Sequence, residues 1–263
     1  MALLISTNMY KGEELPEVFF YLDRFPGRLG VEVFPMFHEA GYGAVLESCL
    51  PRLKKVPVSF HGPYYGAEHS APHGTPDYVR TVEMTARTLE YAQALDSRYM
   101  VYHHNNCRVT EDTREVLVRQ ACENFREIGK MSETRGIPLV VENAGVMERG
   151  NMLLGEDAFI DLCKRERYKV LVDIGHAHAN GWNLERVMEE LGSQVMAYHL
   201  HNNDGIHDCH RRVWDGTLDF DSFLENYRRL TPDADMVLEY SPDAAGDREG
   251  ISSDIERLLR FGV

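Results

Sequence analysis

Short apolar runs alternate with longer amphipathic stretches along most of the chain. The apolar runs have strand length and cover residues 2–6, 29–34, 56–60, 99–103, 137–143, 169–173, 195–201 and 234–240. Between them, apolar residues recur at three- and four-residue spacing, which predicts helices over 76–95, 113–135, 157–165, 184–191, 220–230 and 251–260. Strands that alternate with helices predict a parallel sheet covered by helices.

The number of strand and helix units selects one architecture. Thr75 before Pro76 and Asn183 stand where helix N-caps are favoured, and Gly136 stands where a helix end favours glycine. Eight units in 263 residues favour a closed (β/α)₈ barrel, a TIM barrel, over an open doubly wound sheet. No glycine fingerprint for a dinucleotide follows the first strand, and no linker-like segment divides the chain. We therefore expect a single TIM-barrel domain over residues 1–263.

Charge and cysteine usage narrow the class of partner. The chain has 42 acidic against 28 basic residues and a formal net charge of −14, which disfavours binding to nucleic acid or to anionic membranes. Its five cysteines show no paired spacing, so we expect reduced thiols. No apolar stretch reaches the length of a membrane span, and the first residues do not form a signal peptide. We expect a cytoplasmic protein that acts on a small molecule. The sequence carries no signal for an oligomeric state.

Polar residues gather where the predicted strands end, which is where a TIM barrel carries its active site. They are Glu32, His61, His103, His104, Glu142, Asp173, His176, His199, His201 and Glu239, with Asp208 and His210 in the loop after the seventh strand. Any one buried His or Glu is more often a hydrogen-bonded structural residue than a ligand, but such residues at six successive strand ends indicate a site. A mixed set of carboxylates and imidazoles suits Mn²⁺, Co²⁺, Mg²⁺ or Zn²⁺.

Three other histidines and Glu32 are not expected to be metal ligands. We expect Glu32 to support a ligand rather than to be one, and His178 to have a supporting role. His69 and His73 lie in a loop rich in glycine and proline, so we expect both to be solvated.

Several motifs together resemble the xylose isomerase-like barrel superfamily. They are HGPY at His61, VVENAG around Glu142, VDIGHAHANG around Asp173, HLHNNDG followed by DCH, DGTLDF near Asp219, and LEY at Glu239. That superfamily contains isomerases and epimerases of sugars and sugar phosphates, and also apurinic endonucleases of the endonuclease IV type. Two features depart from it: Trp214-Asp215 replaces the loop glycines usual before GTLDF, and Arg211 and Arg212 follow Asp208 closely.

The resemblance implies a metal site. Glu142, Asp173, His201 and Glu239 would hold one divalent ion, and His201 is preferred to His199 because the spacing to Asp204 is similar to the family's His-x-x-Asp. The endonuclease-like branch uses a wider ligand set, and its matching positions here are His61, His103, His176, Asp208 and His210. We expect one ion (Mn, Co, Mg or Zn), and the wider set would hold two or three zinc ions.

Two functions follow from the resemblance. The first is a sugar or sugar-phosphate isomerase or epimerase, in which Glu142 and Glu239 move a proton on opposite sides of one carbon through a metal-stabilised enediolate. In it, His176 would contact a substrate oxygen, and Arg211 or Arg212 a hydroxyl or phosphate. The alternative is a zinc-dependent hydrolase of phosphodiesters. A barrel that binds sugar without catalysis is disfavoured, because it needs no acid and base on opposed faces. We expect the isomerase or epimerase.

Overall fold

Eight parallel strands close one barrel in chain order, as the alternating pattern predicts. The structure is a computed structural model, and it describes residues 1–262. The strands are β1 (Leu3–Ser6), β2 (Gly30–Val33), β3 (Val58–Phe60), β4 (Met100–Tyr102), β5 (Leu139–Glu142), β6 (Lys169–Asp173), β7 (Val195–Leu200) and β8 (Asp235–Leu238). β1 pairs with both β2 and β8, so the sheet has no free edge. The fold is a single (β/α)₈ TIM barrel.

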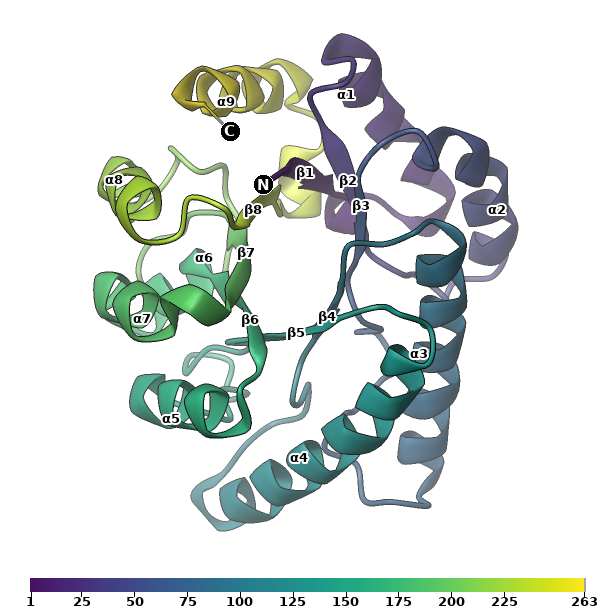
Figure 1. The fold of residues 1–263 in the computed structure, drawn as a ribbon, viewed down its shortest axis with the longest axis vertical. Coiled ribbons are helices and arrows are strands. Elements are labelled where there is room, and N and C mark those ends of the chain that lie inside the picture. Colours follow the sequence, from purple (N-terminus) through teal and green to yellow (C-terminus); the bar gives the residue numbers. More distant parts are fainter. Residues whose placement is uncertain (263) are drawn as a thin grey trace.

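Helices form an outer ring around the strands (Figure 1). They are α1 (Phe19–Arg24), α2 (Tyr42–Leu53), α3 (Pro76–Ala94), α4 (Glu111–Glu133), α5 (Glu156–Glu166), α6 (Ile174–Ala179), α7 (Leu184–Leu191), α8 (Phe220–Leu230) and α9 (Arg248–Phe261). Short 3₁₀ helices join some of them: η1 (Thr7–Met9), η2 (Gly12–Val18), η3 (Gly192–Gln194) and η4 (Pro242–Ala244). The amphipathic helices bury one face against the barrel, which forms the larger core.

Strand residues alternate between the barrel axis and the helix layer. In β4, Met100 and Tyr102 pack in the core under the helices, whereas Val101 packs inside the barrel. The interior cluster consists of Tyr99, Val101, Val140, Leu171 and Ala197. Because side chains alternate with a period of two, this pattern fixes which residue after each strand points toward the barrel axis.

The six predicted helices all form, with ends that differ by a few residues. The predictions for 184–191 and 220–230 match α7 and α8. Thr75 and Asn183 accept hydrogen bonds from the backbone N–H of Tyr78 and Arg186, so both act as N-caps. Gly136 has a φ of +70°, the left-handed conformation that favours glycine at a helix end.

Three helices were not among those predicted. α2 begins after Gly41 without a side-chain cap and contains Pro51, and the segment before α1 is a 3₁₀ helix with an internal proline. Neither segment therefore carries the usual start and stop signals. The third, α6, has only six residues, too few for a helical period to show.

The expectation of a solvated His69 is wrong. Its side chain is 1% exposed, and its ring lies 4.6 Å from that of Tyr102. The side-chain amide of Asn124 in α4 donates to the backbone carbonyls of His69 and Ala71, and this tethers the loop against the helix. His73, by contrast, is exposed as expected.

Two further expectations concern membrane-spanning helices and the cysteine thiols. Within residues 1–262, no helix is both long and apolar enough to cross a bilayer. All five cysteines are free thiols, and Cys49, Cys122 and Cys163 are buried.

Candidate metal centre

The polar residues singled out by the sequence converge at the carboxyl end of the barrel. Counting by two from the interior residues Val101, Val140 and Leu171 leads to His103, Glu142 and Asp173, so their side chains point to the axis. The same count along β7 leads from Ala197 to His199 and His201. All of these carboxylates and imidazoles are buried. His104 has the opposite parity and points into the helix layer.

The segment after β6 builds a compact turn that presents two of these groups. Asp173 ends β6 and is also the N-cap of α6: its Oδ1 accepts a hydrogen bond of 2.7 Å from the backbone N–H of His176. The backbone N–H of Asp173 in turn donates to Oδ1 of Asn143 (2.7 Å). An acid followed by a histidine three residues later therefore serves both the helix start and the site.

A cavity of about 320 Å³ opens above these residues. This volume is at the lower end of the range of small-molecule sites. Its wall contains carboxylates and imidazoles from several strand ends, aromatic rings and side-chain amides: His61, His103, Glu142, His176, Asp208, His210, Glu239, Phe34, Tyr64, Tyr65, Asn8, Asn105, Asn106 and Asn151.

The first cluster comprises His61, His103 and Glu142. Oε2 of Glu142 lies 2.9 Å from Nε2 of His103 and 3.7 Å from Nε2 of His61. The second nitrogen of His103 contacts Oδ1 of Asn106 at 3.1 Å, which fixes the ring.

The second cluster comprises Glu142, Asp173, His199 and Glu239. Nδ1 of His199 lies 3.3 Å from Glu239, 3.5 Å from Glu142 and 3.8 Å from Asp173. Its other nitrogen contacts Oε1 of Glu32 at 3.0 Å. Glu32 therefore orients His199 from behind, as the sequence indicated for a supporting residue.

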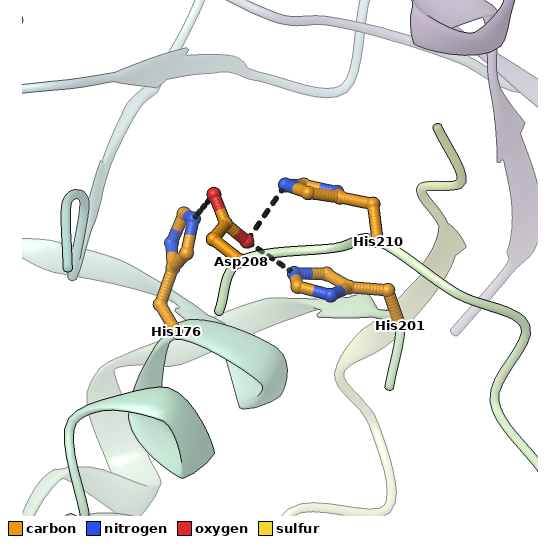
Figure 2. A group of neighbouring side chains, drawn as sticks. All are labelled: His176, His201, Asp208 and His210. Carbon is orange, nitrogen blue, oxygen red and sulfur yellow. Dashed lines mark ion pairs between the residues drawn. The ribbon is translucent and has the colours of Figure 1, made fainter. Parts of the chain in front are cut away.

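The third cluster comprises His176, His201, Asp208 and His210 (Figure 2). Asp208 lies between the rings: its Oδ2 is 3.5 Å from Nε2 of His176, and its Oδ1 is 3.1 Å from Nε2 of His210 and 3.9 Å from Nε2 of His201. His201 also contacts Asp173 at 2.9 Å and stacks on His210 with ring centroids 3.7 Å apart. His201 thus joins the second and third clusters.

His199 rather than His201 lies closest to the two glutamates. His201 approaches neither Glu142 nor Glu239 within 4.0 Å. The His-x-x-Asp spacing that favoured His201 ends in Asp204, which pairs with the exposed His207 at 2.8 Å. The geometry therefore favours His199 as the histidine nearest to both glutamates, while His201 still has a ligand atom within 4.8 Å of Asp173 and Glu239.

The donor atoms are spaced as ligands of metal ions are. Two atoms bound to one tetrahedral Zn²⁺ at about 2.0–2.1 Å lie roughly 3.3–3.4 Å apart. Within the clusters the nitrogen to oxygen distances run from 2.9 Å to 3.9 Å. Several of these atoms are buried without a hydrogen-bond partner: Nδ1 of His176 and His199, and Oδ1 of Asp208. A cation between them would satisfy groups that are otherwise costly to bury, so the residues fit a metal centre.

The acids and imidazoles of the clusters strongly shift one another's pKa values. Burial alone would raise the pKa of Glu142, but His103 and His199 bring it well below its usual value. Burial lowers the pKa of His210, but Asp208, Glu239 and Asp173 together raise it to about 9. Burial raises the pKa of Glu239 to about 7. The clusters therefore attract positive charge, and a bound cation would favour the carboxylate form of Glu239.

The predicted arginines do not lie at the cavity. Arg212 forms a bidentate pair with Asp254 (2.8 and 2.9 Å) and an ion pair with Asp247. The side chain of Arg211 is exposed, and neither arginine lines the cavity. A different arginine, Arg149, does so. It follows β5 in a loop without periodicity, so no signal in the sequence identified it.

His178 lies outside the three clusters. Its Nε2 is 2.9 Å from Oγ1 of Thr217, and its side chain is partly exposed. The contact links α6 to the loop that precedes α8, in keeping with a supporting role.

A family model described as "Xylose isomerase-like TIM barrel" matches residues 27–260. The chain belongs to this family. The uncharacterized protein MJ1614 of Methanocaldococcus jannaschii is 22% identical over 185 residues, which are 70% of this chain and 68% of that protein. The match to the xylose isomerase-like family includes all three clusters.

Solved structures with the same fold have varied descriptions. A D-tagatose 3-epimerase-like protein is similar with a TM-score of 0.77 and 19% identity, over 99% of this chain and 98% of the other. The IOLI protein with a bound zinc atom has a TM-score of 0.75 and 14% identity, over 99% and 96%. An AP endonuclease of family 2 from Brucella melitensis has a TM-score of 0.71 and 18% identity, over 99% of each chain. At these identities the similarities establish the xylose isomerase-like fold.

Proposed function

We propose that the chain is a multi-metal hydrolase that cleaves a small phosphate ester. One observation carries this proposal: Oε2 of Glu142 faces ligands of two clusters at once, His103 at 2.9 Å and His199 at 3.5 Å. Glu142 would therefore help to hold an ion in each of the two clusters, and two-metal sites hydrolyse phosphate esters by activating water and by stabilising the attacking and leaving oxygens. The enediolate mechanism described above uses a single ion, so it leaves the first and third clusters without a role.

The ions, when bound, would lower the pKa of a water molecule toward neutrality and withdraw charge from phosphate oxygens. The chain's own residues prepare the site for them. His61 and His103 form one group of donors with Glu142, and Asp173 and His199 form another. Glu32 and Asn106 hold the rings of His199 and His103 in place. Phe34 and Tyr64 form an aromatic wall that limits the access of bulk water.

The volume of the cavity and the net charge of the protein favour a small substrate over a nucleic-acid duplex. The cavity holds about 320 Å³, and the chain carries a formal charge of −14. Arg149 is the only Lys or Arg that lines the cavity among the described residues. A nuclease that follows a phosphate backbone needs a basic surface, which this rim does not provide. The proposed ions are of the zinc type, since the six imidazoles of the three clusters suit zinc better than magnesium.

Isomerisation or epimerisation of a sugar is the second candidate. Glu142 and Glu239 both line the same cavity, as a pair that removes and returns one proton must. The D-tagatose 3-epimerase-like protein also has the same fold. This candidate requires Glu142 to move a proton as well as to hold an ion, whereas the hydrolase requires it only to hold ions.

Metal content and turnover on the same preparation separate the two candidates. The protein would be purified without chelator or affinity-tag metal, analysed for metal per chain, and assayed with bis(p-nitrophenyl) phosphate and with a panel of ketoses in deuterated water. We expect two or three zinc-type ions per chain, ester hydrolysis and no deuterium in the sugars. One ion per chain with deuterium incorporation would overturn the hydrolase in favour of the epimerase.

A double variant tests the third cluster within the same assay. Asp208→Ala with His210→Ala should remove one ion and the hydrolysis together, because both residues belong to that cluster and to no other. Arg211→Gln serves as the control, since this exposed side chain lies outside the clusters. An unchanged rate of hydrolysis in the double variant would contradict the proposal.

A further inference from the structure

Arg149 is an unusual residue in the wall of the cavity. The groups around it at the strand ends are carboxylates and imidazoles, and the chain as a whole is strongly acidic. Within residues 1–262, no other Lys or Arg lines this cavity. A single guanidinium beside a set of metal ligands would discriminate substrates by charge.

The guanidinium of Arg149 is held in a fixed position, but some of its N–H groups make no hydrogen bond. Nη1 of Arg149 lies 2.9 Å from Oδ2 of Asp208, and Nη2 donates to the backbone carbonyl of the same residue at 2.7 Å. The side chain nevertheless remains 48% exposed. Arginine has five N–H donors, and the described part of the chain offers no third acceptor to this one.

The loop that carries Arg149 is tethered on two sides. Asn180 of the α6 terminus accepts from the backbone N–H of Met147 and donates to the carbonyl of Gly145, both at 2.9 Å. On the other side, Val109 donates to the carbonyl of Gly150 at 2.8 Å. Gly145 has a φ of +86°, and a Cβ there would lie 2.6 Å from the backbone oxygen of Asn151. The loop is therefore preorganised, and ordering it would cost little upon binding.

Two more donors line the same cavity. Oδ1 of Asn151 accepts from the backbone N–H of Val146, whereas its Nδ2 has no hydrogen-bond partner in residues 1–262. Tyr64 also lines the cavity, and its hydroxyl has no such partner in that part of the chain. Donors without partners beside a charged guanidinium are what an anion requires.

We propose that Arg149, Asn151 and Tyr64 form an anion subsite, which binds a carboxylate or phosphate of the substrate other than the ester that is cleaved. This inference rests on the proposed function and extends it: the substrate is a small phosphate ester with a second anionic group. Asp208 links the two parts of the site, because it faces both Arg149 and the third cluster.

Binding of two matched compounds to the metal-loaded protein tests the subsite. Glycerol 3-phosphate and 3-phosphoglycerate, each used as the phosphonate analogue whose P–C bond hydrolysis does not cleave, both present a phosphoryl group to the ions, and only the latter has a second anionic group. We expect titration calorimetry to show that 3-phosphoglycerate binds about tenfold more tightly, the value of one charge-assisted hydrogen bond. Arg149→Gln should abolish this preference and leave the affinity for glycerol 3-phosphate unchanged, whereas Arg211→Gln, with the same loss of charge, should keep it.

Three results would overturn the subsite. They are equal affinities in the unaltered protein, a preference that survives in Arg149→Gln, and loss of a metal ion from Arg149→Gln, which would make Arg149 a positioning residue for Asp208. Since binding is measured without turnover, a failure to hydrolyse any ester would contradict the proposed function and leave the calorimetric preference intact. The two proposals therefore fail separately.

Discussion

Two adjacent histidines at the end of β4 have opposite environments. His103 faces the barrel axis, where its two nitrogens contact Glu142 and Asn106. The ring of His104 lies in the helix layer against Phe125 and Tyr168, and neither of its nitrogens has a hydrogen-bond partner in residues 1–262. The difference arises from strand parity alone. In this barrel, a histidine joins the candidate centre only on the strand face that also carries the carboxylates.

The same contrast separates His199 of the centre from two histidines of the core. Burial lowers the pKa of His104 to about 4 and that of His69 to about 3, because no acid faces either ring. Burial also lowers the pKa of His199, but Glu239 and Glu32 raise it well above the usual value. Core histidines are therefore neutral, whereas the acids of the second cluster favour positive charge on His199 or beside it.

The largest effect is expected from the carboxylate that two clusters share. Glu142→Gln should weaken binding of two ions and reduce hydrolysis by more than about 100-fold, beyond the 10- to 100-fold that loss of a residue behind a ligand causes. Glu239→Gln is the matched control, because Glu239 belongs to the second cluster and not to the first. Metal analysis should show a greater loss for Glu142→Gln. Equal losses in the two variants would argue against a bridging carboxylate.

The residue behind His199 should have the next largest effect. In the unaltered protein, the carboxylate of Glu32 orients the ring of His199 and increases its basicity. Glu32→Gln removes this charge, so the affinity for the ion of the second cluster should fall by about 10- to 100-fold. Competition with a fluorescent zinc chelator would measure the change. Ser59→Ala, which removes only a 3.3 Å hydrogen bond to Glu32, should have less effect. If the two variants behave alike, Glu32 does not act through its charge.

Among the core histidines, His104 should make the free energy of unfolding sensitive to acid. Its pKa in the folded protein, about 4, lies below the usual 6.5, so the unfolded chain takes up a proton first as the pH falls. Stability contributed by the neutral ring is thus lost progressively below about pH 6.5. His104→Phe should reduce the loss in unfolding free energy between about pH 7.5 and pH 5 by about 2 kcal/mol.

Urea unfolding of the variant and the unaltered protein at both pH values measures this difference. Ligand histidines also titrate in this range, but they contribute equally to both proteins and cancel. His73→Gln is the control, since His73 is exposed. An identical pH dependence for His104→Phe and the unaltered protein would contradict the assigned environment.

The period-two pattern made most of the centre predictable from sequence. Once strand ends were identified, parity alone would place Glu142, Asp173 and Glu239 toward the axis and His104 away from it. The choice between His199 and His201 lay beyond this reasoning, because both share one parity. Their difference is in depth along the axis and in which ring nitrogen faces the acids, and this is set by packing: a Cβ at Gly175 would lie 2.0 Å from Cε1 of His201.

Loops limited prediction more than strands did. Arg149 lies between two glycines in a loop held by Asn180 and Asn105, and long-range bonds of this kind leave no periodic trace. Arg212 seemed suited to a substrate because of its position near Asp208, yet its guanidinium pairs with Asp254 of α9, 42 residues away. His69 was taken for a loop residue at the surface, and Asn124 holds that loop in the core.

Substitution of His178 should have the smallest effect, because this residue lies just outside the candidate metal centre. It follows His176 by two residues in the same short helix, but its Nε2 contacts Thr217, and no acid of the three clusters lies within ion-pair distance of it in residues 1–262. His178→Ala should therefore lower the free energy of unfolding by about 1 kcal/mol, the net value of one hydrogen bond, and leave the metal content unchanged. Thr217→Val, which removes the same bond from its other end, should match it. A loss of metal in His178→Ala but not in Thr217→Val would extend the centre to His178, and the distinction between ligand and supporting histidines in α6 would then have to be abandoned.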